Sequence, residues 1–146
     1  MKLYPPHFLL ISVIVMLAIW YVFSSSNPKN IFLMSTGWVL IISGLTCNVI
    51  AANQFIKAKT SIIPLTESSF LVKKGIFRFS RNPMYTGMTI FLIGLGVILN
   101  NFYNIVVIIG FFLLIRNKFV MKEEELLKET FGEEYLSYIK EVRRWI

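Results

Sequence analysis

Three long stretches of this chain contain no charged residue, and they limit what it can fold into. Residues 7–27, 30–56 and 82–115 lack Asp, Glu, Lys and Arg altogether. Each stretch can hold an apolar helix of roughly 17 to 25 residues, the length that crosses the hydrocarbon core of a bilayer. Only helices and closed barrels satisfy their backbone polar groups in that core. The chain is therefore predicted to be an all-α integral membrane protein.

The third stretch is long enough for two spans, and it has a polar break at its centre. The sequence Asn-Asn-Phe-Tyr-Asn at residues 100–104 suits a tight turn at an interface, so this stretch is predicted to form a helical hairpin. A mean hydropathy of +0.65 supports a membrane protein. We expect one membrane domain over residues 1–146, with four spans at about residues 8–23, 31–55, 83–99 and 105–119.

The distribution of basic residues predicts the orientation in the membrane. Loop 57–82 is rich in Lys and Arg with Glu67 as its single acid, whereas the loop after the first span has only Lys29. Cytoplasmic loops carry the excess of Lys and Arg. Loop 57–82, both termini and the charged tail at 121–146 are therefore expected on the cytoplasmic side of the cell membrane.

Two other readings of the chain receive less support from its residues. The first apolar stretch could be a signal peptide, because Lys2 precedes it and the small Ser24 and Ser26 follow. The bulky Trp20 and Tyr21 near its end favour an interfacial anchor. Since Cys and His form no cluster with metal-ligand spacing, we expect no metal site. No nucleic-acid partner is expected either.

The sequence Ser-Arg-Asn-Pro-Met-Tyr-Thr-Gly at residues 80–87 marks the start of the third span. Asn82 is a favoured N-cap residue, and Pro83 is tolerated at the first helical position. The helix start leaves N–H groups unpaired, and Arg81 adds a full charge beside them, which suits a carboxylate or a phosphate. Tyr85 lies one turn further on. Taken alone, the motif could also be a cap with an arginine that reaches the bilayer boundary.

A run of acids follows directly after the last predicted span. Glu123, Glu124 and Glu125 repel one another at an apolar boundary, so a cationic partner is expected. Lys118 and Lys122 lie at helical spacing and could serve. A solvated helix face is the alternative interpretation.

These two segments together resemble a known superfamily. Gly-Ile-Phe-Arg-Phe-Ser-Arg-Asn-Pro-Met-Tyr at residues 75–85 precedes the hairpin, and the pattern EExxLxxxFGxEYxxY follows it from Glu123 to Tyr138. The order is similar to that in the isoprenylcysteine carboxyl methyltransferase and phospholipid methyltransferase superfamily. The resemblance covers about the last half of the chain.

The resemblance implies methyl transfer from S-adenosylmethionine at the cytoplasmic side of the membrane. It implies a cofactor site between the arginine motif and the acidic pair, formed by Phe77, Arg81, Asn82, Pro83, Tyr85, Glu123 and Glu124. No catalytic residue is assigned, because the reaction needs no nucleophile on the protein. We expect the methyl acceptor to be a lipophilic or amphiphilic small molecule that enters from the membrane. Arg116 and Lys118 could attract its head group.

Two departures from the family pattern bear on the acceptor. The family commonly has His where this chain has Asn82, and an amide can bind but cannot exchange protons. The carboxyl methyltransferases also have an arginine shortly before the acidic pair, whereas Arg116 and Lys118 are out of that register. A phospholipid amine methyltransferase is therefore the alternative, and a noncatalytic membrane protein of the same topology is a second. A sterol-type reductase would need more spans.

Two further features have both a structural and a functional interpretation. Gly94 and Gly96 suit close packing of membrane helices, although such glycines could also leave room for a lipid chain. After a helix stop at Gly132, Tyr135 and Tyr138 share one face of a short amphipathic helix, which is expected to lie on the membrane.

The orientation can be tested by labelling single-cysteine variants in intact cells with a membrane-impermeant reagent. Ser25→Cys should react because the loop after the first span is external, whereas Ser68→Cys and Ser137→Cys should react only after permeabilisation. Reaction at Ser68→Cys but not at Ser25→Cys would reverse the orientation.

Overall fold

The computed structural model describes residues 3–23, 30–66 and 70–145, and these residues form helices and loops with no strand. Ser25 and Ser68 of the labelling experiment lie outside them. The helices in chain order are α1 (Pro5–Val22), α2 (Ile31–Lys57), α3 (Pro83–Leu99), α4 (Asn104–Ile115), α5 (Met121–Phe131) and α6 (Glu133–Glu141). A 3₁₀ turn, η1 (Gly75–Arg78), precedes α3, and a π-helical turn, η2 (Arg116–Val120), joins α4 to α5.

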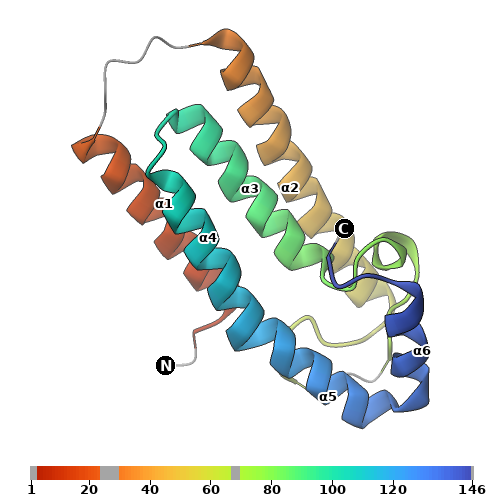
Figure 1. Cartoon of the computed structure of the whole chain (residues 1–146). Coiled ribbons are helices and arrows are strands. Elements are labelled where there is room, and N and C mark those ends of the chain that lie inside the picture. The colour runs from red at the N-terminus through yellow and green to blue at the C-terminus, as the bar shows by residue number, and fades with distance from the viewer. Residues whose placement is uncertain (1–2, 24–29, 67–69, 146) are drawn as a thin grey trace.

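Helix α3 is the central element of the bundle. It packs against α2 on one side and against α1 and α4 on the other (Figure 1). Met16 of α1, Leu92 of α3 and Phe111 of α4 share one buried apolar cluster. Because the site motif begins at Pro83, the start of α3, this packing holds the motif in place.

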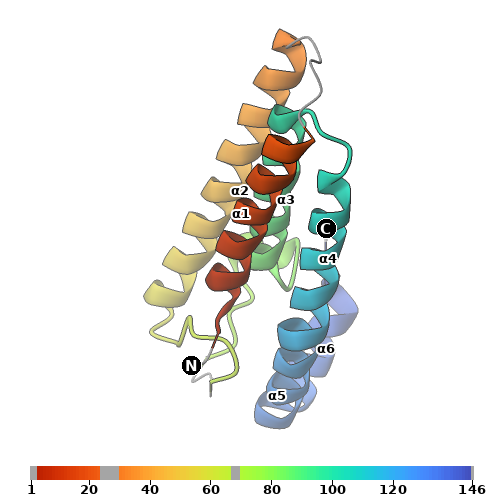
Figure 2. The ribbon, with the colours of Figure 1, turned by 90° about the vertical axis from the view of Figure 1, so that its left-hand side faces the viewer.

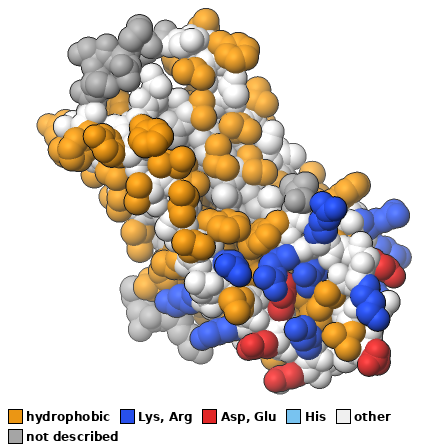
Figure 3. Space-filling model, viewed as in Figure 1, with side chains coloured by type: hydrophobic (Ala, Val, Ile, Leu, Met, Phe, Trp, Pro, Cys, Tyr) orange, Lys and Arg blue, Asp and Glu red, His pale blue; other side chains and the backbone are white. Residues whose placement is uncertain are grey.

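The surface divides into an apolar part and a charged part. Large apolar side chains such as Trp38 of α2 and Val106 of α4 are exposed along the bundle, as expected for helices that face lipid. Charged side chains gather at one end, over α5, α6 and the loop before α3 (Figure 3). The prediction that the chain is an all-α membrane protein is therefore confirmed.

The number of spans is less simple than the predicted four. Among the described residues, three helical segments are long and apolar enough to cross a bilayer: Pro5–Val22, Ile31–Lys57 and the continuous segment Asn104–Phe131. Helix α3 is apolar but has only 17 residues. Such a helix rises about 25 Å, which is slightly less than the ~30 Å hydrocarbon core. A fourth span at α3 stays a prediction.

The helix that contains the predicted fourth span continues well beyond the expected end of that span at residue 119. Helix α4 runs through the π turn Arg116–Val120 directly into α5. A π turn holds one extra residue, which rotates every following side chain by about 100°. Gly132, with φ of +50°, then ends α5 as predicted.

The glycines of α3 face other helices. A Cβ atom on Gly94 would lie 2.7 Å from the Gly37 carbonyl oxygen and 2.8 Å from the Ile41 nitrogen in α2. A Cβ atom on Gly96 would lie 3.2 Å from Ile108 of α4. The packing interpretation is confirmed, and the room that we considered for a lipid chain is filled by neighbouring helices.

The tail packs against the protein with its tyrosine face. Tyr135 and Tyr138 are buried together with Leu71 and Val142, so the face that was expected to lie on the membrane instead covers the loop before α3. Figure 2 shows α5 and α6 together at one end of the bundle. The tyrosine face is therefore part of the protein core at this end, and whether another face of the tail lies on the membrane stays a prediction.

Gly94→Ala should destabilise the protein by about 1–3 kcal/mol, because the new methyl group meets backbone atoms that cannot move aside. Gly110→Ala is the matched control, since nothing lies within 4 Å of a Cβ at that position. The control should be neutral or slightly stabilising. The free energy of unfolding in mixed micelles measures both, and equal stability of the two variants would contradict the proposed α2–α3 contact.

Candidate functional site

Asn82 occupies the predicted N-cap position of α3, but its side chain does not cap the helix. Its backbone carbonyl accepts a hydrogen bond from the Thr86 N–H at 3.0 Å, and its own N–H donates to Ser80 Oγ at 3.1 Å. The side-chain amide donates from Nδ2 to the backbone oxygen of Arg144 at 3.1 Å. The motif is therefore tied to the end of the chain.

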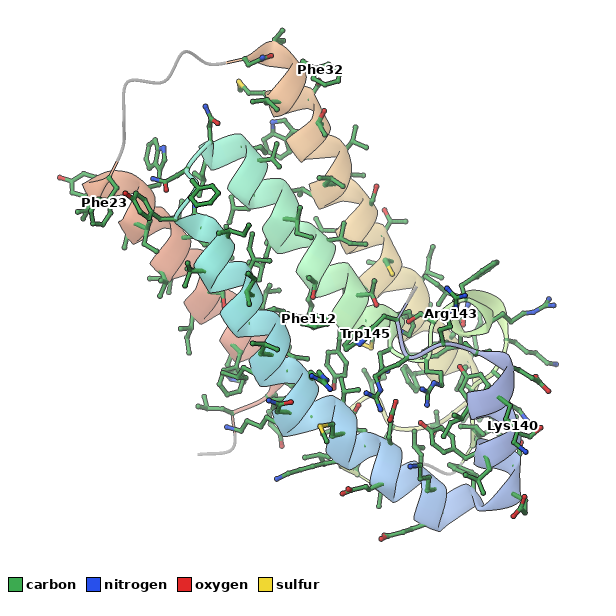
Figure 4. The ribbon with its side chains drawn as sticks, in the orientation of Figure 1. Phe23, Phe32, Phe112, Lys140, Arg143 and Trp145 are labelled. Carbon is green, nitrogen blue, oxygen red and sulfur yellow. The ribbon has the colours of Figure 1, made fainter. Side chains whose placement is uncertain are left out.

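Residues 142–145, here called the C-terminal strap, follow α6 and lie against the start of α3. The Arg81 N–H donates to the Arg143 carbonyl oxygen at 3.0 Å, and Ser80 Oγ donates to that of Arg144 at 3.3 Å. The Trp145 ring lies 4.9 Å from the Phe112 ring of α4 (Figure 4). The strap thus contacts both helices that flank the site.

A buried cluster of three charges lies between these elements. Arg144 donates to both oxygens of Glu124, from Nε at 2.9 Å and from Nη2 at 2.7 Å. Arg81 Nη1 lies 3.1 Å from Glu124 Oε1. The side chains of Arg81 and Glu124 are only 9% and 8% exposed. A carboxylate so deeply buried is tolerated because both of its oxygens are paired.

These partners of Glu124 differ from the predicted ones. Lys118 and Lys122 were expected to balance the acidic run, but Glu124 pairs with Arg81 and Arg144 instead. The π turn before α5 rotates the acidic run relative to α4, and Glu124 faces Arg81 and the C-terminal strap. Sequence reasoning missed Arg144, although two adjacent arginines near the chain end were a visible source of cations.

The neighbouring acid has a separate environment. Glu123 Oε1 accepts a hydrogen bond of 2.8 Å from the Tyr85 hydroxyl of α3. Hence the two acids of the predicted pair play different parts: Glu124 belongs to the arginine cluster, and Glu123 belongs to the tyrosine.

Two tyrosines of α6 add polar groups beside Phe77 and Arg81. The Tyr138 hydroxyl donates to the Phe77 carbonyl oxygen at 2.6 Å, and Arg81 Nη1 donates to the Tyr135 oxygen at 3.4 Å. Burial raises the pKa of both hydroxyl groups, and the charge of Glu124 raises that of Tyr135 further. Both tyrosines therefore stay protonated at neutral pH.

Two cavities adjoin these residues and share part of their lining. One has a volume of about 110 Å³ and is closed by Glu124, Leu126, Leu127 and the α6 tyrosines. The other, of about 330 Å³, extends toward the start of α1 and is lined by Tyr4, Pro5, Pro6, Met84 and Met88. The residues that line both are Phe55, Ile62, Ile63, Pro64, Phe77, Arg81, Asn82 and Glu123.

All seven residues of the predicted cofactor site line one or both of these cavities. Phe77, Arg81, Asn82 and Glu123 line both, Pro83 and Tyr85 line only the larger, and Glu124 lines only the smaller. The predicted substrate residues do not join them, because neither Arg116 nor Lys118 lines either cavity. Lys118 Nζ lies over the Phe8 ring, 4.7 Å from its centre. Among the described residues, no group of acids, His and Cys could hold a metal ion.

The sequence model of the phospholipid methyltransferase family matches residues 32–134, which is more than half of the chain. The chain belongs to this family, which lies within the group of membrane methyltransferases that includes the isoprenylcysteine carboxyl methyltransferases. It is thus a multi-pass membrane protein and a methyltransferase. No curated protein matches the chain. The family match ends before the C-terminal strap.

Glu124→Gln should lower the free energy of unfolding by about 3 kcal/mol, because it leaves the buried Arg81 guanidinium without its carboxylate. Glu125→Gln is the control, since Glu125 is exposed and should change stability by less than about 0.5 kcal/mol. Unfolding in mixed micelles compares the two variants. Equal effects at both positions would show that the Arg81–Glu124 pair does not stabilise the fold.

Proposed function

We propose that the protein transfers a methyl group from S-adenosylmethionine to a lipid acceptor at the cytoplasmic face of the cell membrane. The observation that supports this proposal most strongly is the pair of adjoining cavities with a shared wall of motif residues. A transfer between two bound molecules needs two sites that meet at the reacting atoms. Arg81, Asn82 and Glu123 lie at this shared wall.

The residues at the wall fit the amino-acid end of the cofactor. That end carries a carboxylate and an ammonium group, and Arg81 at the wall suits the carboxylate. Arg81 also has a donor to spare, since its Nε is buried and has no hydrogen-bond partner in the described part of the chain. Phe77 and Phe55, whose rings lie 5.1 Å apart, offer aromatic faces for the adenine or the sulfonium.

The acceptor is proposed to occupy the larger cavity. Its apolar lining at Pro5, Pro6, Met84 and Met88 suits an acyl chain, and Glu123 lies at its polar end. A carboxylate there favours a head group with an amine over one with a carboxylate. Phospholipids with a primary or secondary amine meet this description, in keeping with the family.

The protein contributes to the reaction by orienting the two bound molecules and by accepting a proton. When bound, S-adenosylmethionine supplies an electrophilic methyl group on a sulfonium. Glu123 is placed to hold the amine and to accept the proton that it loses as the new N–C bond forms. The hydrogen bond from Tyr85 fixes the direction of that carboxylate. Apolar residues line much of the larger cavity, and surroundings of low polarity favour a reaction that disperses charge.

Transfer to a carboxylate, as in the isoprenylcysteine enzymes, receives less support. It would need a basic residue that is free to hold the acceptor: Arg116 and Lys118 line neither cavity, and Arg81, which lines both, is assigned here to the carboxylate of the cofactor. A prenylcysteine should therefore be a poor acceptor.

The purified protein in nanodiscs can be given methyl-labelled S-adenosylmethionine together with phosphatidylethanolamine, a prenylcysteine or water-soluble amines. Label should enter the organic phase with phosphatidylethanolamine. Met84→Trp, which fills the larger cavity, should raise KM for the lipid at least fivefold and leave cofactor affinity unchanged, whereas Met84→Leu should resemble the native protein. Loss of cofactor binding in Met84→Trp would show that the cofactor, and not the lipid, occupies the larger cavity. A native protein that neither binds the cofactor nor transfers its methyl group would refute the function.

A further inference from the structure

The C-terminal strap joins the arginine motif although it lies outside the part of the chain that matches the family. We propose that Arg144 is a positioning residue that occupies both oxygens of Glu124 and so leaves Arg81 available for the carboxylate of a bound ligand. The inference rests on the proposed function, in which that ligand is S-adenosylmethionine.

The first argument is the unequal geometry of the two arginines. Arg144 grips Glu124 with two nitrogens, at 2.9 and 2.7 Å, which is the strong bidentate arrangement. Arg81 reaches the same carboxylate through one nitrogen, at 3.1 Å. Its Nε is buried and without a partner within the described residues. Arg81 therefore holds more donors than the cluster can satisfy.

The second argument is the charge of the cluster. Two guanidinium groups flank one carboxylate, which leaves one positive charge in excess; the Arg81 and Glu124 side chains are buried, and the Arg144 side chain is 35% exposed. A single additional carboxylate would balance it. Without Arg144, Arg81 and Glu124 would form a neutral pair, and Glu124 could compete with the ligand for the Arg81 donors.

The third argument is that the strap is held by other contacts besides the Arg144 side chain. The main-chain oxygens of Arg143 and Arg144 accept hydrogen bonds from Arg81, Asn82 and Ser80. Trp145 packs on Phe112 of α4. Removing the Arg144 guanidinium should therefore leave the strap in its place and change mainly the charge on Glu124.

The test compares two nucleosides by calorimetry on the full-length protein in detergent. S-adenosylhomocysteine carries the amino-acid carboxylate, and 5′-methylthioadenosine lacks the amino-acid end. Arg144→Ala should weaken binding of S-adenosylhomocysteine about tenfold or more. Without its charge-assisted contact to Arg144, Glu124 would compete with the ligand carboxylate for the Arg81 donors. It should leave the affinity for 5′-methylthioadenosine within twofold. Lys140→Ala removes one exposed charge near the strap and should change neither.

A double variant separates positioning from a general structural role. Glu124→Gln in the Arg144→Ala background removes the charge that competes for Arg81, so binding of S-adenosylhomocysteine should recover at least threefold over Arg144→Ala. Arg144→Lys, which keeps the charge but not the bidentate grip, should lie between the native protein and Arg144→Ala. These two variants keep the test decisive if one of them fails to fold.

Each result decides between the possibilities. Equal weakening of both nucleosides by Arg144→Ala, or no weakening of either, would overturn the positioning role while leaving the methyltransferase function intact. A folded double variant that binds S-adenosylhomocysteine no better than Arg144→Ala would also overturn it. A native protein that binds neither nucleoside would overturn the proposed function and, with it, this inference.

Discussion

One buried carboxylate holds the functional end of this protein together. Glu124 comes from α5, whereas its partners Arg81 and Arg144 come from the loop before α3 and from the C-terminal strap. An unpaired buried charge costs several kcal/mol, so the three segments are stable only when they meet. This contact shapes the wall of the smaller cavity and the direction of Arg81, and it adds to the main-chain hydrogen bonds that seat the strap.

The membrane explains why the polar machinery is concentrated at one end. Along the bundle, α1 to α4 expose apolar side chains, and α2 and α3 approach each other closely through glycines, with Asn48 of α2 as a polar group against Gly87. Charged residues collect at one end of the bundle (Figure 3). There two cavities share one wall, which supports the proposed transfer from a water-soluble methyl donor to a lipid acceptor.

Much of the site could be predicted because it lies in two local motifs. Asn82 and Pro83 mark a helix start through their own backbone preferences, and the acids beyond the last span require cationic partners. The identities of those partners could not be predicted. Arg144 lies 20 residues from Glu124, and the strap reaches the motif only because Gly132 turns the chain and the tyrosines of α6 pack on Leu71. Sequence spacing alone favoured Lys118 and Lys122.

By itself, the sequence determined that the chain is an α-helical membrane protein with a polar end, because long uncharged stretches leave the backbone no other way to cross a bilayer. It also determined where α3 begins and where α5 ends, since Pro83 and Gly132 act through local backbone geometry. Only the tertiary structure decided which way each side chain of the acidic run faces. The π turn rotates α5 by one residue, and this rotation directs Glu124 to the arginines and Glu123 to Tyr85.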